Sequence, residues 1–149
     1  MPTCNSGSSG GGTKSTNKKS KLDKIENQEY QYHATTGTAI FSIYEQGLKP
    51  NRGHAGKAIY FAPSESDALE WTETSSTGGK VLMRVKTNTL KSKYGWGLLD
   101  EDESIASKKI KSSDIEIKSG SKWMTLNEFV QKRSTSYKYW KSSRKNNIL

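Results

Sequence analysis

Hydrophobic residues recur along the chain in short blocks, and their spacing predicts short strands and helices. The alternating, aromatic-rich stretch EYQYHATT, which starts at Glu29, is typical of a strand. From Gly37 to Gln46, apolar residues recur three and four positions apart, as on one face of an amphipathic helix, and Gly47 is placed to end that helix. The blocks KAIYFA and KVLMRVKT predict two more strands, the second of them central in a sheet.

Capping residues mark two further helices. Ser64 followed by Asp67, and Thr125 followed by Glu128, both have the capping-box spacing, with Asp67 in place of the usual glutamate. The segment LKPNRGHAG reads as a polar loop, and the acidic turn LDEDE leads to the short strand candidates SIAS and DIEIK. Together these elements predict a strand-dominated α+β fold with short helices.

Composition divides the chain into three parts. Residues 1–28 are rich in Ser, Gly, Asn and Lys, and we expect a disordered basic tail there. Residues 29–131 contain the predicted strands and helices, and their length fits one domain, which we expect to be monomeric. Residues 132–149 form a segment without acidic residues in which aromatic and basic side chains alternate.

The basic residues that give the net charge of +9 are concentrated near the two ends of the chain. Basic residues with aromatic neighbours are the composition that proteins use for phosphate backbones and unpaired bases. The alternative is a solvated terminus whose lysines only aid solubility. The C-terminal residues in question are Lys132, Arg133, Tyr137, Lys138, Tyr139, Trp140, Lys141, Arg144 and Lys145.

Several function classes lack their sequence signatures. Cys4 is the sole cysteine, so no disulfide forms within the chain, and an intracellular, reducing location is expected. No apolar run predicts a signal peptide or a membrane span. One cysteine and two histidines do not build a structural zinc site, so no metal is expected. Phosphate-binding loops of the GxxxxGK[ST] or GxGxxG type and a GxSxG elbow are also missing from the sequence.

Four segments together resemble a known enzyme core. YHATT, the helix ending in EQGL, GKAIYFAPSESDALEW and DESIAS are similar to the catalytic core of diphtheria-toxin-like ADP-ribosyltransferases, above all to the poly(ADP-ribose) polymerase branch. The resemblance covers residues 30–120, and GKAIYFA is its most specific part. It implies an ADP-ribosyltransferase-like split β-sandwich and NAD as the substrate.

The resemblance assigns roles to a histidine, a tyrosine and a glutamate. His33 would bond a ribose hydroxyl, and Tyr60 would stack on the nicotinamide ring. Glu103 would bond the ribose 2′-hydroxyl and stabilise the cation that forms when the bond to nicotinamide breaks. Glu101 would share a face with Glu103 in an extended segment and remains an alternative. Glu116 is a second alternative for the catalytic carboxylate.

Further NAD contacts follow from the same resemblance. Trp71 stands where the family has a second stacking tyrosine, so it would sandwich the nicotinamide with Tyr60. Ala34, Thr35 and Ala68 would also contact NAD. Ala34 replaces the family's glycine, and Ala68 replaces a serine that holds the nicotinamide amide. His54, in the polar loop, is expected to be exposed or to neighbour the adenosine rather than to act in catalysis.

The resemblance therefore predicts a mono-ADP-ribosyltransferase that moves ADP-ribose from NAD to a macromolecular acceptor, either protein or nucleic acid, and releases nicotinamide. The alternative is a catalytically weak module on the same fold that binds NAD, ADP-ribose or nucleic acid. A related RNA 2′-phosphotransferase branch ranks lower, because it depends on arginines and histidines, and the core offers only Arg52 and Arg84.

Overall fold

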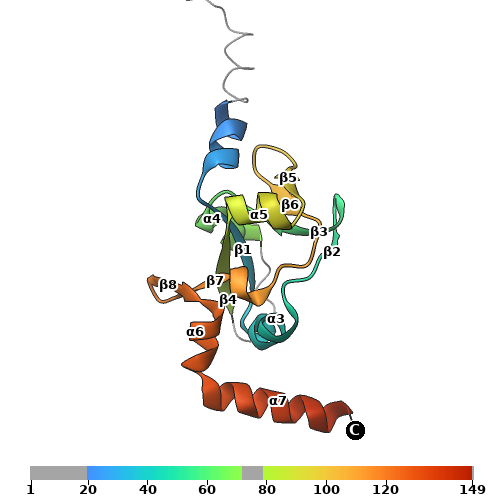
Figure 1. The fold of residues 1–149 in the computed structure, drawn as a ribbon, viewed down its shortest axis with the longest axis vertical. Coiled ribbons are helices and arrows are strands. Elements are labelled where there is room, and N and C mark those ends of the chain that lie inside the picture. The colour runs from blue at the N-terminus through green and yellow to red at the C-terminus, as the bar shows by residue number, and fades with distance from the viewer. Residues whose placement is uncertain (1–19, 72–78, 149) are drawn as a thin grey trace, which may run out of the picture.

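Two four-stranded antiparallel sheets form the fold in the computed structural model, which describes residues 20–71 and 79–148 (Figure 1). The first sheet has the order β1-β4-β7-β8, with β1 Tyr30–Thr36, β4 Lys80–Lys86, β7 Glu116–Ser119 and β8 Lys122–Thr125. The second has the order β2-β3-β6-β5, with β2 Asn51–Gly53, β3 Gly56–Phe61, β6 Ser104–Ala106 and β5 Trp96–Leu98. The predicted central position of β4 is confirmed.

Helices connect and flank the sheets, so the fold is mixed α+β. The expected strand dominance is wrong, because α7 alone adds 15 helical residues and residues 20–27 are helical as well. These two helices lie at opposite ends of the molecule (Figure 1). The remaining helices are η1 Gly37–Ala39, α3 Ile40–Gln46, α4 Glu65–Trp71, α5 Thr87–Lys93, η2 Ser112–Asp114 and α6 Leu126–Gln131, and α7 spans Ser134–Ile148.

The structure differs from the predicted three-part division at the N-terminal boundary of the domain. Residues 1–19 of the predicted disordered tail lie outside the described part of the chain. Residues 20–27 of the same predicted tail form a helix whose Ile25 is buried and whose Ile25 carbonyl accepts a hydrogen bond from Gln31 Nε2 at 2.9 Å. The described fold thus includes chain that precedes Glu29.

The core contains apolar residues from both sheets. Ile59 and Phe61 of β3 pack with Met83 and Val85 of β4 and with Ile117 of β7, and all five are buried. Their neighbours along each strand point to the opposite face of the sheet, as the two-residue period of a strand requires, and Leu82 packs there in a second buried cluster. Burial of this apolar area provides the main driving force that holds the two sheets together.

A short bridge joins the two sheets where β1 passes β3. Tyr32 N donates to Ala62 O at 3.0 Å, and Ala62 N donates to Tyr32 O at 2.8 Å. Because His33 follows Tyr32 and Tyr60 lies two residues before Ala62, the bridge brings these two predicted site residues close together.

Local signals explain where the helices begin and end. Thr125 Oγ1 accepts from Glu128 N at 3.1 Å, and Ser64 Oγ accepts from Asp67 N at 3.2 Å, so both predicted caps are confirmed. Gly47 ends α3 with φ 85°, a value that favours glycine.

The predicted loop LKPNRGHAG is different in the structure, because β2 pairs with β3 to form a hairpin. The register places Asn51 opposite Ala58 and Gly53 opposite Gly56. The two residues between these glycines, His54 and Ala55, form the tip of this β2–β3 hairpin.

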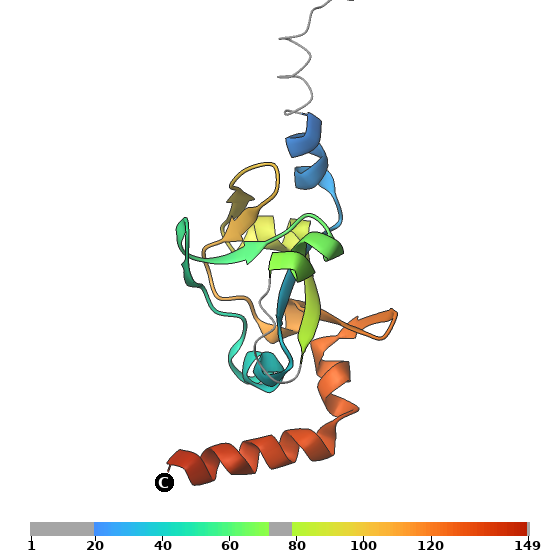
Figure 2. The same ribbon diagram turned by 180° about the vertical axis from the view of Figure 1, so that it is seen from behind.

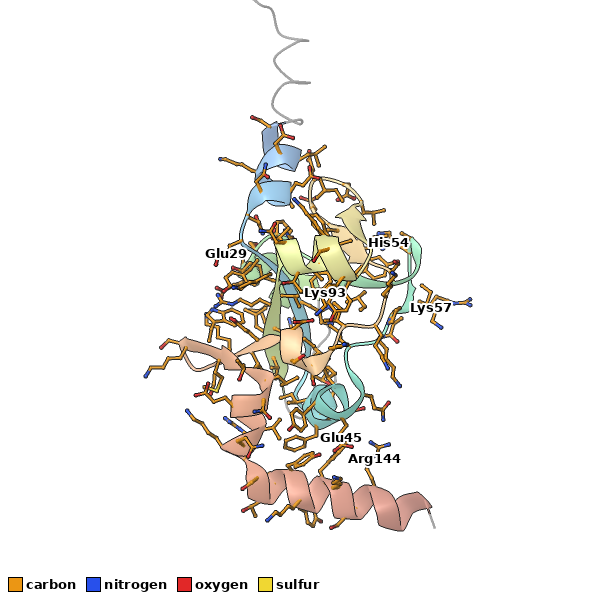
Figure 3. All side chains as sticks on the ribbon, viewed as in Figure 1. Glu29, Glu45, His54, Lys57, Lys93 and Arg144 are labelled. Atoms are coloured by element: carbon orange, nitrogen blue, oxygen red, sulfur yellow. The ribbon has the colours of Figure 1, made fainter. Side chains whose placement is uncertain are left out.

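Aromatic residues of α7 pack against α3. The Phe41 ring lies 5.5 Å from the Tyr137 ring and 5.7 Å from the Trp140 ring, measured between centroids. Lys141 Nζ lies 3.7 Å from a Glu45 carboxylate oxygen, and Figure 3 shows Arg144 and Glu45 on the facing sides of the two helices. The C-terminal segment therefore uses two of its three aromatic rings for packing, whereas Tyr139 is 75% exposed.

Seen from behind, α7 crosses below the sheets and lies away from the β2–β3 hairpin (Figure 2). Among the helices in the described residues, none is both long and apolar enough to cross a membrane.

We expect Met83→Ala to lower the free energy of unfolding by about 2–5 kcal/mol, because it leaves a cavity in a core where Met83 is fully buried between the two sheets. Urea denaturation followed by circular dichroism measures this change. Lys108→Ala, at an exposed position, is the control and should change stability by less than about 0.5 kcal/mol. A Met83→Ala protein as stable as the control would contradict this description of the core.

Candidate functional site

A cavity of about 570 Å³ opens beside the β1–β3 bridge. It brings together residues from β1, β3, α4 and the segment before β6, although they lie far apart in the sequence. Five of the predicted site residues line it, namely His33, Ala34, Tyr60, Ala68 and Glu103. The cavity is also lined by Tyr32, His54, Asp100 and Asp102, which sequence analysis did not select as catalytic or NAD-binding residues.

His33 is fixed by the backbone of the neighbouring sheet. Its Nδ1 lies 2.8 Å from the carbonyl oxygen of Tyr60, and because a carbonyl only accepts, Nδ1 carries the proton. In the neutral imidazole, Nε2 is then an acceptor. Desolvation lowers the pKa of His33 below its usual value, and the hydrogen bond to the Tyr60 carbonyl acts against that shift. The neutral form is therefore favoured near pH 7.

The Tyr60 side chain packs against the hairpin that carries it. Its hydroxyl donates to Gly56 O at 2.7 Å and accepts from Ala55 N at 2.9 Å. Its ring lies so close to Gly53 that a Cβ atom at that position would overlap the ring. Tyr60 thus fixes the tip of the β2–β3 hairpin while its ring forms part of the cavity wall.

Glu103 lies at the end of the turn between β5 and β6. The backbone N–H groups of Leu99 and Asp100 donate to Glu103 O at 2.9 and 3.0 Å, so this segment is a tight turn. The expectation that Glu101 and Glu103 share one face of an extended segment is therefore wrong, and Glu101 is not among the cavity-lining residues. Glu116 lies in the other sheet, where its Oε1 accepts from Arg84 at 2.7 Å.

Glu103 has a close partner in His54. The His54 Nε2 lies 2.8 Å from Glu103 Oε1, and the side chains are 67% and 13% exposed, respectively. Burial raises the pKa of Glu103 above its usual value, whereas the nearby His54 acts to lower it and the charge of Asp100 acts to raise it. The cavity therefore contains a partly buried carboxylate whose ionisation depends on its neighbours.

His54 was expected in a loop, exposed or near the adenosine, and the structure places its exposed side chain beside the predicted catalytic glutamate. Its ring also lies 5.3 Å from the Tyr60 ring between centroids, with a 35° angle between the planes. The sequence signal for this position is Gly-His-Ala-Gly, in which two glycines flank a two-residue hairpin loop. That pattern places His54 at the tip of a strand pair whose second strand carries Tyr60.

One predicted NAD contact, Thr35, does not line the larger cavity. Thr35 lines a second cavity of about 220 Å³, and His33 lines both cavities. Trp71 is the last residue of α4, and its side chain lies outside the described part of the structure. Its stacking role stays a prediction.

No protein-family model matches the sequence, and no curated protein is found to be similar to it. Within residues 20–71 and 79–148, no three His, Cys, Asp or Glu side chains are grouped so that they could hold a metal ion.

We expect the free energy of unfolding to fall as the pH is lowered from 7.5 toward 5.5, in part because of His33. Its pKa is lowered in the folded state, so the unfolded chain takes up the proton first. The stability gained from the neutral imidazole is complete above the unfolded pKa of 6.5 and is lost as the pH falls below it. Urea denaturation at several pH values measures the slope.

His33→Gln and His33→Asn remove this titration, so both variants should show a flatter dependence between pH 7.5 and 5.5 than the wild type, whatever their absolute stability. Equal slopes in all three proteins would show that His33 is not held in its neutral form by the fold.

Proposed function

We propose that the protein is a mono-ADP-ribosyltransferase that transfers ADP-ribose from NAD to a macromolecular acceptor and releases nicotinamide. One observation carries the proposal: His33, Tyr60 and Glu103 come from three separate segments and line one cavity. The order of these residues along the chain resembles that of the His-Tyr-Glu transferases. A fold with two sheets around a shared core is compatible with the split β-sandwich of that family.

The two cavities that His33 lines would each hold one half of a dinucleotide. The larger, at about 570 Å³, has the size of a small-molecule site and would take the nicotinamide and its ribose. The smaller, bordered by Thr35 and α3, would take the adenosine. Nε2 of His33 would then accept a hydrogen bond from a ribose hydroxyl, because the Nδ1 proton is donated to Tyr60 O.

The acidic wall of the larger cavity favours cleavage of the nicotinamide–ribose bond. As that bond breaks, its electron pair moves to the nicotinamide nitrogen, the ring leaves as a neutral molecule, and the sugar becomes positively charged. Glu103, with Asp100 and Asp102 beside it, places negative charge next to the developing cation. Such preorganised charge stabilises the transition state more than the bound substrate.

The nicotinamide would lie among Tyr60, Ala34 and Ala68, which line the same cavity. Trp71 would complete a sandwich with Tyr60, since a cationic pyridinium is attracted by aromatic faces. Transfer of a single ADP-ribose is favoured over polymer formation, because the chain between α3 and β3 folds as a tight hairpin that offers little surface for a second, chain-extending ADP-ribose.

We expect Glu103→Gln to lower the rate of nicotinamide release by about 100- to 1,000-fold, because the amide cannot stabilise the sugar cation as a carboxylate does. The affinity for NAD should change little, since the lost interaction acts mainly in the transition state. Single-turnover kinetics and NAD titration by calorimetry measure the two quantities separately.

Glu101→Gln is the matched control, because Glu101 lies two residues away and does not line the cavity. It should retain near wild-type rates. An inactive Glu101→Gln beside an active Glu103→Gln would move the catalytic role to Glu101.

We expect Trp71→Ala to weaken the binding of a nicotinamide-like inhibitor by about 1–2 kcal/mol, because the variant loses one stacking face. Trp71→Tyr keeps an aromatic face and should bind almost as well as the wild type. Tryptophan fluorescence during the titration reports both. Unchanged affinity in Trp71→Ala would remove Trp71 from the proposed sandwich.

A further inference from the structure

His54 and Glu103 form a pair at the mouth of the cavity. Nε2 of His54 lies 2.8 Å from Oε1 of Glu103, and the imidazole is largely exposed while the carboxylate is largely buried. Figure 3 shows His54 at the tip of the β2–β3 hairpin, near the turn that carries Glu103. The pair therefore connects the interior of the cavity with the side from which an acceptor would approach.

The hydrogen bond sets the orientation of the imidazole. When neutral His54 donates from Nε2–H to the carboxylate, its lone pair lies on Nδ1. Among the described residues, no hydrogen bond to Nδ1 of His54 is present. A carboxylate that orients an imidazole, whose other nitrogen takes a proton from a nucleophile, is the arrangement that activates hydroxyl groups in many hydrolases.

The surrounding structure holds His54 in this position. The Tyr60 hydroxyl restrains the tip of the hairpin through hydrogen bonds to Gly56 O and from Ala55 N. The Tyr60 ring lies beside the imidazole at 5.3 Å between centroids. The other charged groups of the cavity are Asp100 and Asp102, which lie on the turn before Glu103. His54 thus lies on a hairpin whose tip is hydrogen-bonded to the Tyr60 side chain, and this positions the imidazole beside Glu103.

We propose that His54 is the general base that takes the proton of the acceptor, and that the acceptor group is a neutral hydroxyl. The inference rests on the proposed transferase function. Glu103 uses Oε1 to orient His54, and its Oε2 is left for the 2′-hydroxyl of the ribose, next to the reacting carbon C1′. His54, which is hydrogen-bonded to Oε1, would therefore lie close to C1′.

The reaction step balances without any further reactant. The acceptor oxygen forms a bond to C1′ while the C1′–N bond to nicotinamide breaks, and the electron pair of that bond goes to the nicotinamide nitrogen. The hydroxyl proton moves to Nδ1 of His54, which becomes an imidazolium paired with Glu103. Water then takes this proton. An anionic nucleophile has no proton to lose and does not need His54.

The test compares nucleophiles with and without a proton. Purified wild type and His54→Ala are incubated with NAD in water, with added methanol or with added azide, and ADP-ribose, methyl ADP-ribose and ADP-ribosyl azide are separated by chromatography. We expect His54→Ala to form the first two products about 100- to 10,000-fold more slowly, the usual range for general base catalysis. The azide product should be slowed far less than the other two, because only the loss of the Glu103 partner affects it, and free imidazole should partly restore methanolysis.

Lys57→Ala is the matched control, because Lys57 lies on the same hairpin and extends into solvent (Figure 3). It should behave as wild type with all three nucleophiles. An equal loss with methanol and azide would show that His54 acts only by positioning Glu103, and faster turnover with tighter NAD binding in His54→Ala would show that it blocks the site. Either result overturns this inference alone. A wild type that consumes no NAD with any nucleophile overturns the proposed function as well.

Discussion

The crossing of β1 and β3 is the contact on which the candidate site depends. There, Tyr32 and Ala62 exchange two backbone hydrogen bonds, and the next residue along β1, His33, donates from Nδ1 to Tyr60 O at 2.8 Å. These three bonds join two sheets that also pack against each other through apolar side chains. They bring a histidine from one sheet and a tyrosine from the other to a single cavity and fix the tautomer of the histidine.

Acidic side chains gather on one wall of the cavity beside this crossing. The turn before β6 places Glu103 with Asp100 and Asp102 on one wall of the cavity, where burial raises the pKa of Glu103. His54, from the opposite hairpin, counteracts this shift by pairing with the carboxylate. The ionisation of Glu103 thus depends on both desolvation and His54, which the tip of the β2–β3 hairpin positions beside the carboxylate.

Strong local patterns in the sequence predicted most of the framework. The alternation in EYQYHATT, the helical period before Gly47 and the caps at Ser64 and Thr125 all determine structure within a few residues, and each is present as expected. β2 was missed because three polar residues carry no period, and its pairing depends on β3. For the same reason the partner of Glu103 was not foreseen. Composition places the rings of Tyr137 and Trp140 in a basic, aromatic segment suited to nucleic acid. Their packing on Phe41 depends on the tertiary fold, which composition does not predict.

The proposed transferase activity requires this cavity to break the bond between nicotinamide and ribose and to pass the sugar to an acceptor. The most direct measurement incubates the purified protein with NAD labelled in the adenine, together with separate pools of protein, RNA and DNA, and quantifies free nicotinamide and macromolecule-bound label. We expect nicotinamide release together with label on at least one pool. Intact NAD, with no free nicotinamide and no label on any pool, would contradict it.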